Sequence, residues 1–229
     1  MGFSFLFALN AKGYRFVAEE LKSVLHTNVK VVLIPWALAP HDALPHSIEE
    51  YFPRFGRRYE REISYLREFG VLDKNVSILD DSDPHICDEI HSSDVVILCG
   101  GDPELLVNKL QKTKIDTVLQ GYDGVIIGGS AGATSQFDDY FITPDQSFYN
   151  KLQVCKGIGL IQSDFLIDVH TNQYAIERSE SENKAYLDLL KRIGDEFDRK
   201  IYGICDEGAI IYDRVTKVYR TYGKVILIK

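Results

Sequence analysis

The chain has 229 residues, of which 45% are hydrophobic and 26% are charged. This length and composition are typical of a soluble α/β protein, and we expect residues 1–229 to form a single domain. The net charge of −8 argues against nucleic acid as the main partner, because phosphate binding needs a basic surface. No apolar run approaches the roughly 18 residues of a membrane span, so we expect no membrane partner.

The cysteines and the first residues of the chain indicate its compartment. Cys87, Cys99, Cys155 and Cys205 include no C-x-x-C pair, and Cys99 and Cys205 end apolar runs, which is typical of buried thiols. The apolar segment 1–16 lacks a basic n-region and is more typical of a first strand than of a signal peptide. These features predict a reduced, cytoplasmic protein without a metal site.

Strand and helix patterns alternate along the chain. Short apolar segments rich in β-branched residues predict strands at 3–9, 29–35, 75–79, 94–99, 123–128 and 201–205. Segments with helical spacing predict helices at 14–26, 47–69, 84–91, 103–112, 115–120, 131–136 and 180–198. Apolar strands separated by helices indicate an α/β three-layer sandwich with a mostly parallel central sheet. A small antiparallel C-terminal portion is predicted from short strands at 208–213, 217–220 and 223–228.

Charged and aromatic residues gather in the segment 40–62. The favoured interpretation is a solvated helix that covers the sheet. The alternative is a helix that faces a substrate.

The most informative segment is YDGVIIGGSAGATS, residues 122–135. An apolar strand leads into the G-x-S-x-G pattern of residues 128–132, and small residues follow as if a helix starts there. A serine on such a sharp turn has its Oγ exposed, and the helix N-terminus supplies N–H groups for a developing oxyanion. The pattern predicts Ser130 as a nucleophile, while a turn that binds phosphate or only reverses the chain is the alternative.

A serine nucleophile needs a base and a group that orients the base. His170 is the only one of six histidines that follows Ser130, and it comes just after the apolar run 165–167. Sites in open α/β sheets form at such strand ends. The chain order therefore predicts serine, then histidine, then acid, which differs from the order in α/β-hydrolases.

Four carboxylates are candidates for the orienting acid. Asp206 and Glu207 come where the predicted strand 201–205 stops, and either could orient the imidazole. Asp145 and Asp168 are weaker candidates. Asp145 follows the serine turn by a loop, and strand alternation places Asp168 on the same face as the histidine two residues later.

A second glycine turn occurs in VVILCGGDPELL, residues 95–106. An apolar strand leads into Gly100 and Gly101, and a helix follows. Two glycine turns at adjacent strand ends would place both backbones near one reacting carbonyl, so we expect this turn and the N–H of Ala131 to hold an oxyanion. A phosphate cradle is the alternative, but the segment lacks the G-K-[ST] ending of a P-loop, and G-x-G-x-x-G is absent.

These four segments together resemble the peptidase E family, the aspartyl dipeptidases and their relatives the cyanophycinases. CGGDPELL resembles the family's glycine-rich turn, IIGGSAGA its nucleophile turn, IDVHTN its histidine segment and YGICDEGAI its acid segment. The resemblance covers most of the chain, and the four motifs come in the family's order. It implies a flavodoxin-like fold, similar to class I glutamine amidotransferases, and a serine peptidase with the triad Ser130, His170 and Asp206. It also implies a small peptide substrate and no cofactor.

Several residues depart from the family's pattern. Asp206 stands where the family usually has glutamate, and Asp102 replaces the usual asparagine after the glycines. An aspartyl dipeptidase should hold the substrate's carboxylate with an arginine after the histidine loop. That stretch, 177–190, has Arg178 and Lys184 among several acidic residues, so Arg178 and Asp102 are the candidate substrate-binding residues. Because Asp102 would repel an acidic side chain, we expect weak cleavage of Asp-X dipeptides.

Two other functions are compatible with the sequence. The first is a family member that binds a ligand without cleaving it, or that hydrolyses another small amide substrate. The acidic surroundings of the site fit this alternative. A class I amidotransferase-like domain shares the layout but needs a cysteine at position 130, where this chain has serine. A homodimer is an oligomeric state that the sequence allows.

Overall fold

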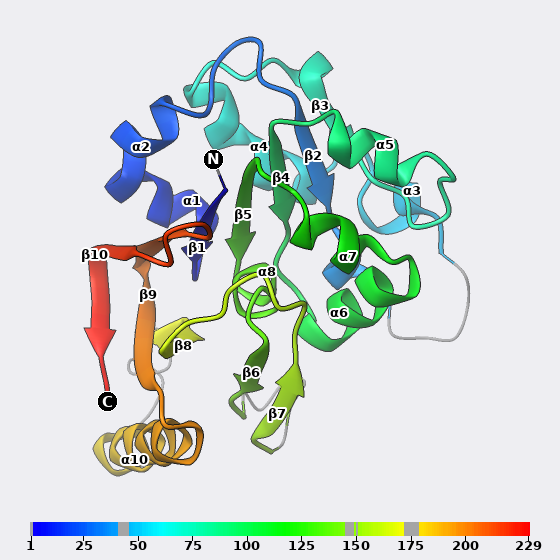
Figure 1. Ribbon diagram of the computed structural model, residues 1–229. Coiled ribbons are helices and arrows are strands. Elements are labelled where there is room, and N and C mark those ends of the chain that lie inside the picture. The colour runs from blue at the N-terminus through cyan, green and yellow to red at the C-terminus, as the bar shows by residue number, and fades with distance from the viewer. Residues whose placement is uncertain (1, 41–45, 145–148, 150, 172–178) are drawn as a thin grey trace.

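The computed structural model describes residues 2–40, 46–144, 149, 151–171 and 179–229. The strands of its main sheet are β1 (Phe3–Phe7), β2 (Val31–Ile34), β3 (Val76–Ile78), β4 (Val95–Leu98), β5 (Val125–Gly129), β8 (Phe165–Val169), β9 (Lys200–Asp213) and β10 (Tyr219–Leu227). Seven of the eight strands follow the order β10-β9-β1-β5-β4-β2-β3, and the eighth, β8, pairs with β9. Helices lie on both sides of the sheet, so the predicted α/β class is confirmed (Figure 1).

The helices are α1 (Asn10–Gly13), α2 (Ala18–Lys22), α3 (Ile48–Tyr51), α4 (Arg57–Glu68), α5 (Ile86–His91), α6 (Pro103–Lys112), α7 (Ile115–Gln120), α8 (Ala131–Thr134) and α10 (Glu180–Phe197). The bounds of α6 and α7 are those that the sequence predicts. Helix α6 begins cleanly because the Asp102 side chain accepts a hydrogen bond from the N–H of Leu105 and Pro103 occupies the first turn. In the described part of the chain, no helix has both the length and the apolar character needed to cross a membrane.

Two predicted helices are broken in the structure. The predicted helix 47–69 is α3 and α4, separated by a turn in which the Gly56 N–H donates to the Pro53 carbonyl and Phe55 has a φ of 64°. The predicted helix 14–26 is a 3₁₀ turn, Tyr14–Val17, followed by α2. Val17, with φ −122° and ψ 26°, leaves the helical region between them.

The predicted breaks within the C-terminal strands are wrong. The segments predicted as strands at 201–205 and 208–213 form one strand, β9, which continues through Asp206 and Glu207. The segments 217–220 and 223–228 likewise form β10, with an irregularity at Gly223, where φ is 61°. The two adjacent acidic residues are typical of a loop in the sequence, but in the structure charged partners from other elements hold them within the strand.

The pairing of β9 brings the carboxyl ends of several strands together. Strand β8 runs parallel to the first part of β9, ending at the pair Val169 and Ile204. Strand β1 runs antiparallel to the second part, ending at the pair Phe7 and Ala209. Because β10 occupies the other edge, β8 and β1 approach each other end to end along one edge of β9. The carboxyl end of β5 lies next to that of β1, and the carboxyl end of β4 lies on the far side of β5.

The interior is divided between two apolar clusters. The larger one surrounds β1, β2, β4 and β5, and the smaller one lies around β8, β9 and α10. Cys99 and Cys205 are fully buried, as predicted. A separate hairpin, β6 (Asp139–Ile142) and β7 (Gln153–Lys156), was not predicted, because its strands are short and β7 is largely exposed.

Candidate active site

Ser130 stands on the turn between β5 and α8 in a strained backbone conformation. Its φ is 51° and its ψ is −114°, a region that residues other than glycine rarely adopt. The turn is held because the Ser130 N–H donates to the Phe7 carbonyl at 2.9 Å. It is also tightly packed, since a Cβ on Gly132 would overlap the Leu98 carbonyl. The structure therefore exposes the hydroxyl at the carboxyl edge of the sheet.

His170 and Asp206 complete a hydrogen-bonded row with Ser130. The Nε2 atom of His170 lies 3.1 Å from Ser130 Oγ, and its Nδ1 atom lies 3.0 Å from Asp206 Oδ1. His170 follows the last residue of β8 and has a left-handed φ of 60°. The three side chains come from β5, β8 and β9, whose ends the sheet pairing brings together. Arranged in this way, an imidazole can take a proton from the hydroxyl while the carboxylate holds its other nitrogen.

Strand alternation separates the two adjacent acids of β9. The side chain of Asp206 is 10% exposed and reaches His170, whereas that of Glu207 is 43% exposed. Lys12, on α1, lies 3.1 Å from Asp206 Oδ2 and 3.8 Å from Glu207 Oε1. Both oxygens of Asp206 therefore have a donor. Lys12 was not singled out in the sequence, although polar residues after the carboxyl end of a first strand are a general signal of a site.

The surroundings of Asp206 favour its ionised form. Burial raises the pKa of this carboxyl, but hydrogen bonds and charge from His170 and Lys12 outweigh that effect, and the net pKa lies below its ordinary value of 3.8. A carboxylate that stays ionised can hold the Nδ1–H of a neutral imidazole and leave Nε2 free to accept a proton.

The two glycine turns lie against each other. At Gly100, a Cβ would lie 3.2 Å from the Cβ of Ser130. Gly101 has a φ of 144°, and a Cβ there would overlap the Ala37 carbonyl. A side chain therefore fits poorly at either position. Among the described residues, neither the Gly101 N–H nor the Ala131 N–H donates a hydrogen bond. These two donors are therefore available to an oxygen bound beside Ser130.

The other residues singled out in the sequence are not part of the hydrogen-bonded row. The carboxylate of Asp102 caps α6, and after burial its influence is the next largest cause that raises the pKa of Tyr149. Asp168 is buried and accepts hydrogen bonds from Thr171 and Tyr186, not from His170. Asp145 and Arg178 fall outside the described residues.

Two hollows flank Ser130 and His170. We name the first the β6 hollow; it has a volume of about 100 Å³, and its lining includes Thr134, Phe141, Thr143, Tyr149 and Asp168. We name the second the α4 hollow; it has a volume of about 290 Å³, and its lining includes Leu9, Asn10, Leu38, Arg61 and Glu62. Arg61 and Glu62 belong to the segment that the sequence suggested would cover the sheet. The α4 part of that segment therefore faces the site, which was the less favoured interpretation.

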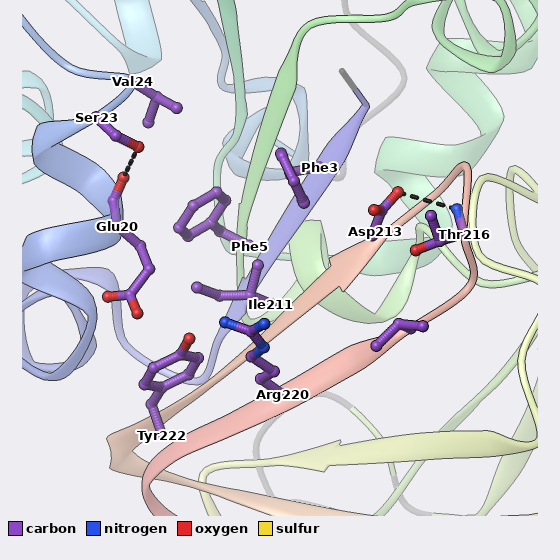
Figure 2. A pocket seen from close by; sticks show the side chains of 11 residues that line it. Phe3, Phe5, Glu20, Ser23, Val24, Ile211, Asp213, Thr216, Arg220 and Tyr222 are labelled. Carbon is purple, nitrogen blue, oxygen red and sulfur yellow. Dashed lines mark hydrogen bonds between the residues drawn. The ribbon is translucent and has the colours of Figure 1, made fainter.

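A third hollow, of about 410 Å³, lies apart from this site (Figure 2). It is bounded by α2 and by the strands β1, β9 and β10, and Phe3 and Phe5 form part of its lining. Phe3 begins β1, whereas the site lies beyond the other end of that strand. The hollow holds no histidine, cysteine or lysine among the described residues that line it. Within the same described ranges, no group of His, Cys, Asp and Glu side chains could hold a metal ion.

The chain is similar to known peptidases over nearly its whole length. The sequence profile of Peptidase family S51 matches residues 8–217. A Listeria monocytogenes EGD-e protein named as a candidate peptidase E has a TM-score of 0.67 and 21% identity, covering 98% of this chain and 99% of that one. A peptidase from an acI-B1 actinobacterium has a TM-score of 0.65 and 20% identity, covering 100% and 91%. A search of curated protein sequences finds no match.

The profile match and the fold define the class of this protein as a serine-type peptidase. The chain belongs to peptidase family S51, because the match spans most of its 229 residues. The resemblance to peptidase E that the motifs indicate is thereby confirmed.

The lowered pKa of Asp206 predicts a pH-dependent contribution to stability. Since the folded-state pKa lies below the unfolded value, the contribution is present above about pH 5 and is lost as the pH falls through the folded-state pKa. The free energy of unfolding of Asp206→Asn should therefore differ most from wild type at neutral pH, and the difference should shrink towards pH 3. Denaturant titrations at several pH values measure it.

Lys12→Met provides the matched variant for this experiment. Removing the ammonium group should raise the pKa of Asp206 towards its unfolded value, so this variant should lose less stability than wild type between neutral pH and pH 3. A difference between wild type and Asp206→Asn that is the same at pH 3 and pH 7 would contradict the assignment.

Proposed function

We propose that this protein hydrolyses short peptides through a catalytic triad of Ser130, His170 and Asp206. The observation that carries the proposal is the hydrogen-bonded row of these three side chains, with Ser130 on a strained turn at the carboxyl edge of the sheet. The limited size of the two flanking hollows supports a small substrate over a long polypeptide.

The proposed reaction has two halves. Ser130 Oγ attacks the scissile carbonyl carbon, and its proton passes to His170 Nε2. The N–H groups of Gly101 and Ala131 stabilise the oxyanion of the tetrahedral intermediate. The C–N bond then breaks, and the leaving amine takes the proton from Nε2. In the second half, water gives a proton to Nε2 and attacks the acyl carbon, and the proton returns to Oγ as the acid product leaves.

Replacing Ser130 by alanine should abolish hydrolysis and leave the fold intact. We expect a loss of about 10⁴-fold or more in kcat, because the nucleophile is removed. The free energy of unfolding should change by about 1 kcal/mol or less, since the hydroxyl makes one side-chain hydrogen bond. A fluorophosphonate probe should label wild type and not the variant. An unlabelled wild-type protein, or activity of the variant within tenfold of wild type, would refute the nucleophile.

The two acids of β9 should differ strongly in their effect on activity. Asp206→Asn should reduce kcat by about 10³- to 10⁴-fold, because an amide permits the wrong imidazole tautomer. Glu207→Gln is the matched control and should have little effect, since Glu207 contacts Lys12 and not His170. Steady-state kinetics of the two variants measure this ranking, and the reverse order would assign the role to Glu207.

Asp-X dipeptides should be weak substrates. None of the described residues that line the β6 hollow is a lysine or an arginine, and Arg61 in the α4 hollow is already paired with Glu62. We therefore expect kcat/KM for Asp-Leu to be lower than for Ala-Leu and Lys-Leu. A clear preference for Asp-Leu would contradict this, and Arg61→Gln and Arg178→Gln would then show which arginine binds the substrate's carboxylate.

A further inference from the structure

The third hollow, which we name the α2 hollow, lies over one face of the sheet where β1, β9 and β10 pair (Figure 2). Phe5 pairs with Ile211 and Ile211 pairs with Arg220, so these three side chains form one row across that face. On the helical side, the hollow is bounded by Glu20 of α2 and by Val24 just beyond it. Its volume of about 410 Å³ lies within the range of roughly 300 to 1,000 Å³ that is usual for small-molecule sites.

The base of the α2 hollow is apolar. Phe5 and Ile211 are almost fully buried there, and Phe3 and Val24 are partly buried beside them. Val218, which also lines the hollow, is 58% exposed. The side chains of Phe3, Val24 and Val218 therefore leave apolar surface in contact with water. Covering that surface with an apolar group of a ligand is favourable.

Two opposite charges lie at one end of the hollow. Figure 2 shows Glu20 and Arg220 there, beside the hydroxyl of Tyr222. Burial raises the pKa of that hydroxyl, Glu20 raises it further and Arg220 lowers it, so both charges lie close to the same group. Among the described residues, Glu20 and Arg220 take part in no ion pair, and Lys22 pairs with Glu19 instead. The hollow thus offers an acceptor of cations and a donor to anions side by side.

The remaining acid of the lining is committed to a turn. The carboxylate of Asp213 accepts hydrogen bonds from the N–H groups of Val215 and Thr216, at 2.9 and 3.1 Å. It stabilises the connection between β9 and β10, on the opposite side of the hollow from Glu20 (Figure 2). Glu20 and Arg220 are therefore the charged groups in the described lining that can bind a ligand.

We propose that the α2 hollow binds a free amino acid with a large apolar side chain. The carboxylate of the ligand binds Arg220, its ammonium group binds Glu20, and its side chain packs against Phe3, Val24 and Val218. A free amino acid carries both charges on one carbon and its apolar group on the same carbon, which is the arrangement that the hollow presents. An apolar carboxylate without an ammonium group leaves Glu20 without a partner and is the poorer match.

The proposed site is separate from the peptidase site. Phe3 begins β1, and Ser130 lies beyond the other end of that strand, where its N–H donates to the Phe7 carbonyl. A ligand in the α2 hollow therefore does not contact the triad. Because the inference concerns binding, it stands or falls independently of whether the protein hydrolyses peptides.

Calorimetric titrations with three related ligands test the proposal. L-phenylalanine carries both charges, phenylalaninamide lacks the carboxylate, and 3-phenylpropanoate lacks the ammonium group. All titrations use Ser130→Ala, so that the amide is not hydrolysed. L-phenylalanine should bind about 10-fold or more tightly than either analogue, because each analogue lacks one charge-assisted contact.

Two further substitutions in Ser130→Ala assign the two charges. Arg220→Gln should remove the preference for phenylalanine over phenylalaninamide, and Glu20→Gln should remove the preference over 3-phenylpropanoate. Lys224→Gln on β10 and Glu19→Gln on α2 are the matched controls, since neither residue lines the hollow, and both should keep the two preferences. A ratio of two ligands within one variant does not depend on how much of the protein is folded.

Three outcomes would overturn the amino-acid site. The first is undetectable binding of L-phenylalanine at about 10 mM. The second is a preference that survives in both Arg220→Gln and Glu20→Gln, which would place the ligand elsewhere, or binding of 3-phenylpropanoate that is tighter than that of phenylalanine. The third is a wild-type dimer, seen by analytical ultracentrifugation, that Val218→Asp separates, because a second copy of the chain would then cover the hollow.

Discussion

The site depends on one structural constraint, the continuity of β9. Because β10 pairs with one edge of this strand, β8 and β1 share the other edge and meet end to end. Asp206 occupies the interval between them, after the last residue that pairs with β8 and before the first that pairs with β1. A break in β9 at this point would remove the register that holds the carboxylate, the histidine and the serine turn within hydrogen-bonding distance.

Basic residues from α1 and α4 balance the acidic charges around the site. Lys12 compensates Asp206 on one side of Ser130, and Arg61 partly compensates Glu62 on the other. Both acids are buried, but they differ in how well they are satisfied. Burial raises the pKa of both acids. For Asp206, the hydrogen bonds from His170 and Lys12 outweigh burial and lower the pKa, whereas for Glu62 burial dominates. The first suits a carboxylate that stays ionised.

The two hollows beside Ser130 differ in chemistry as well as in size. The β6 hollow is lined by apolar side chains from β6 and β8 and by polar ones such as Thr134 and Tyr149. Its acid, Asp168, accepts hydrogen bonds from Thr171 and Tyr186. The lining of the α4 hollow includes the ion pair of Arg61 and Glu62. Asp102, which the sequence placed near the substrate, caps α6 with its carboxylate.

The sequence by itself determined the features that depend on local residue patterns. The apolar strands, the helices after Asp102 and Lys114, and the glycine turn around Ser130 follow from periodicity, capping and the absence of side chains. Only the tertiary structure decided what depends on neighbours distant in the chain. In the sequence, Asp206 and Glu207 are equivalent adjacent acids. In the structure, strand alternation points them to opposite faces of β9, and only Asp206 reaches the histidine that follows β8. Glu62 gains its place beside the serine from helix packing, which no local pattern encodes.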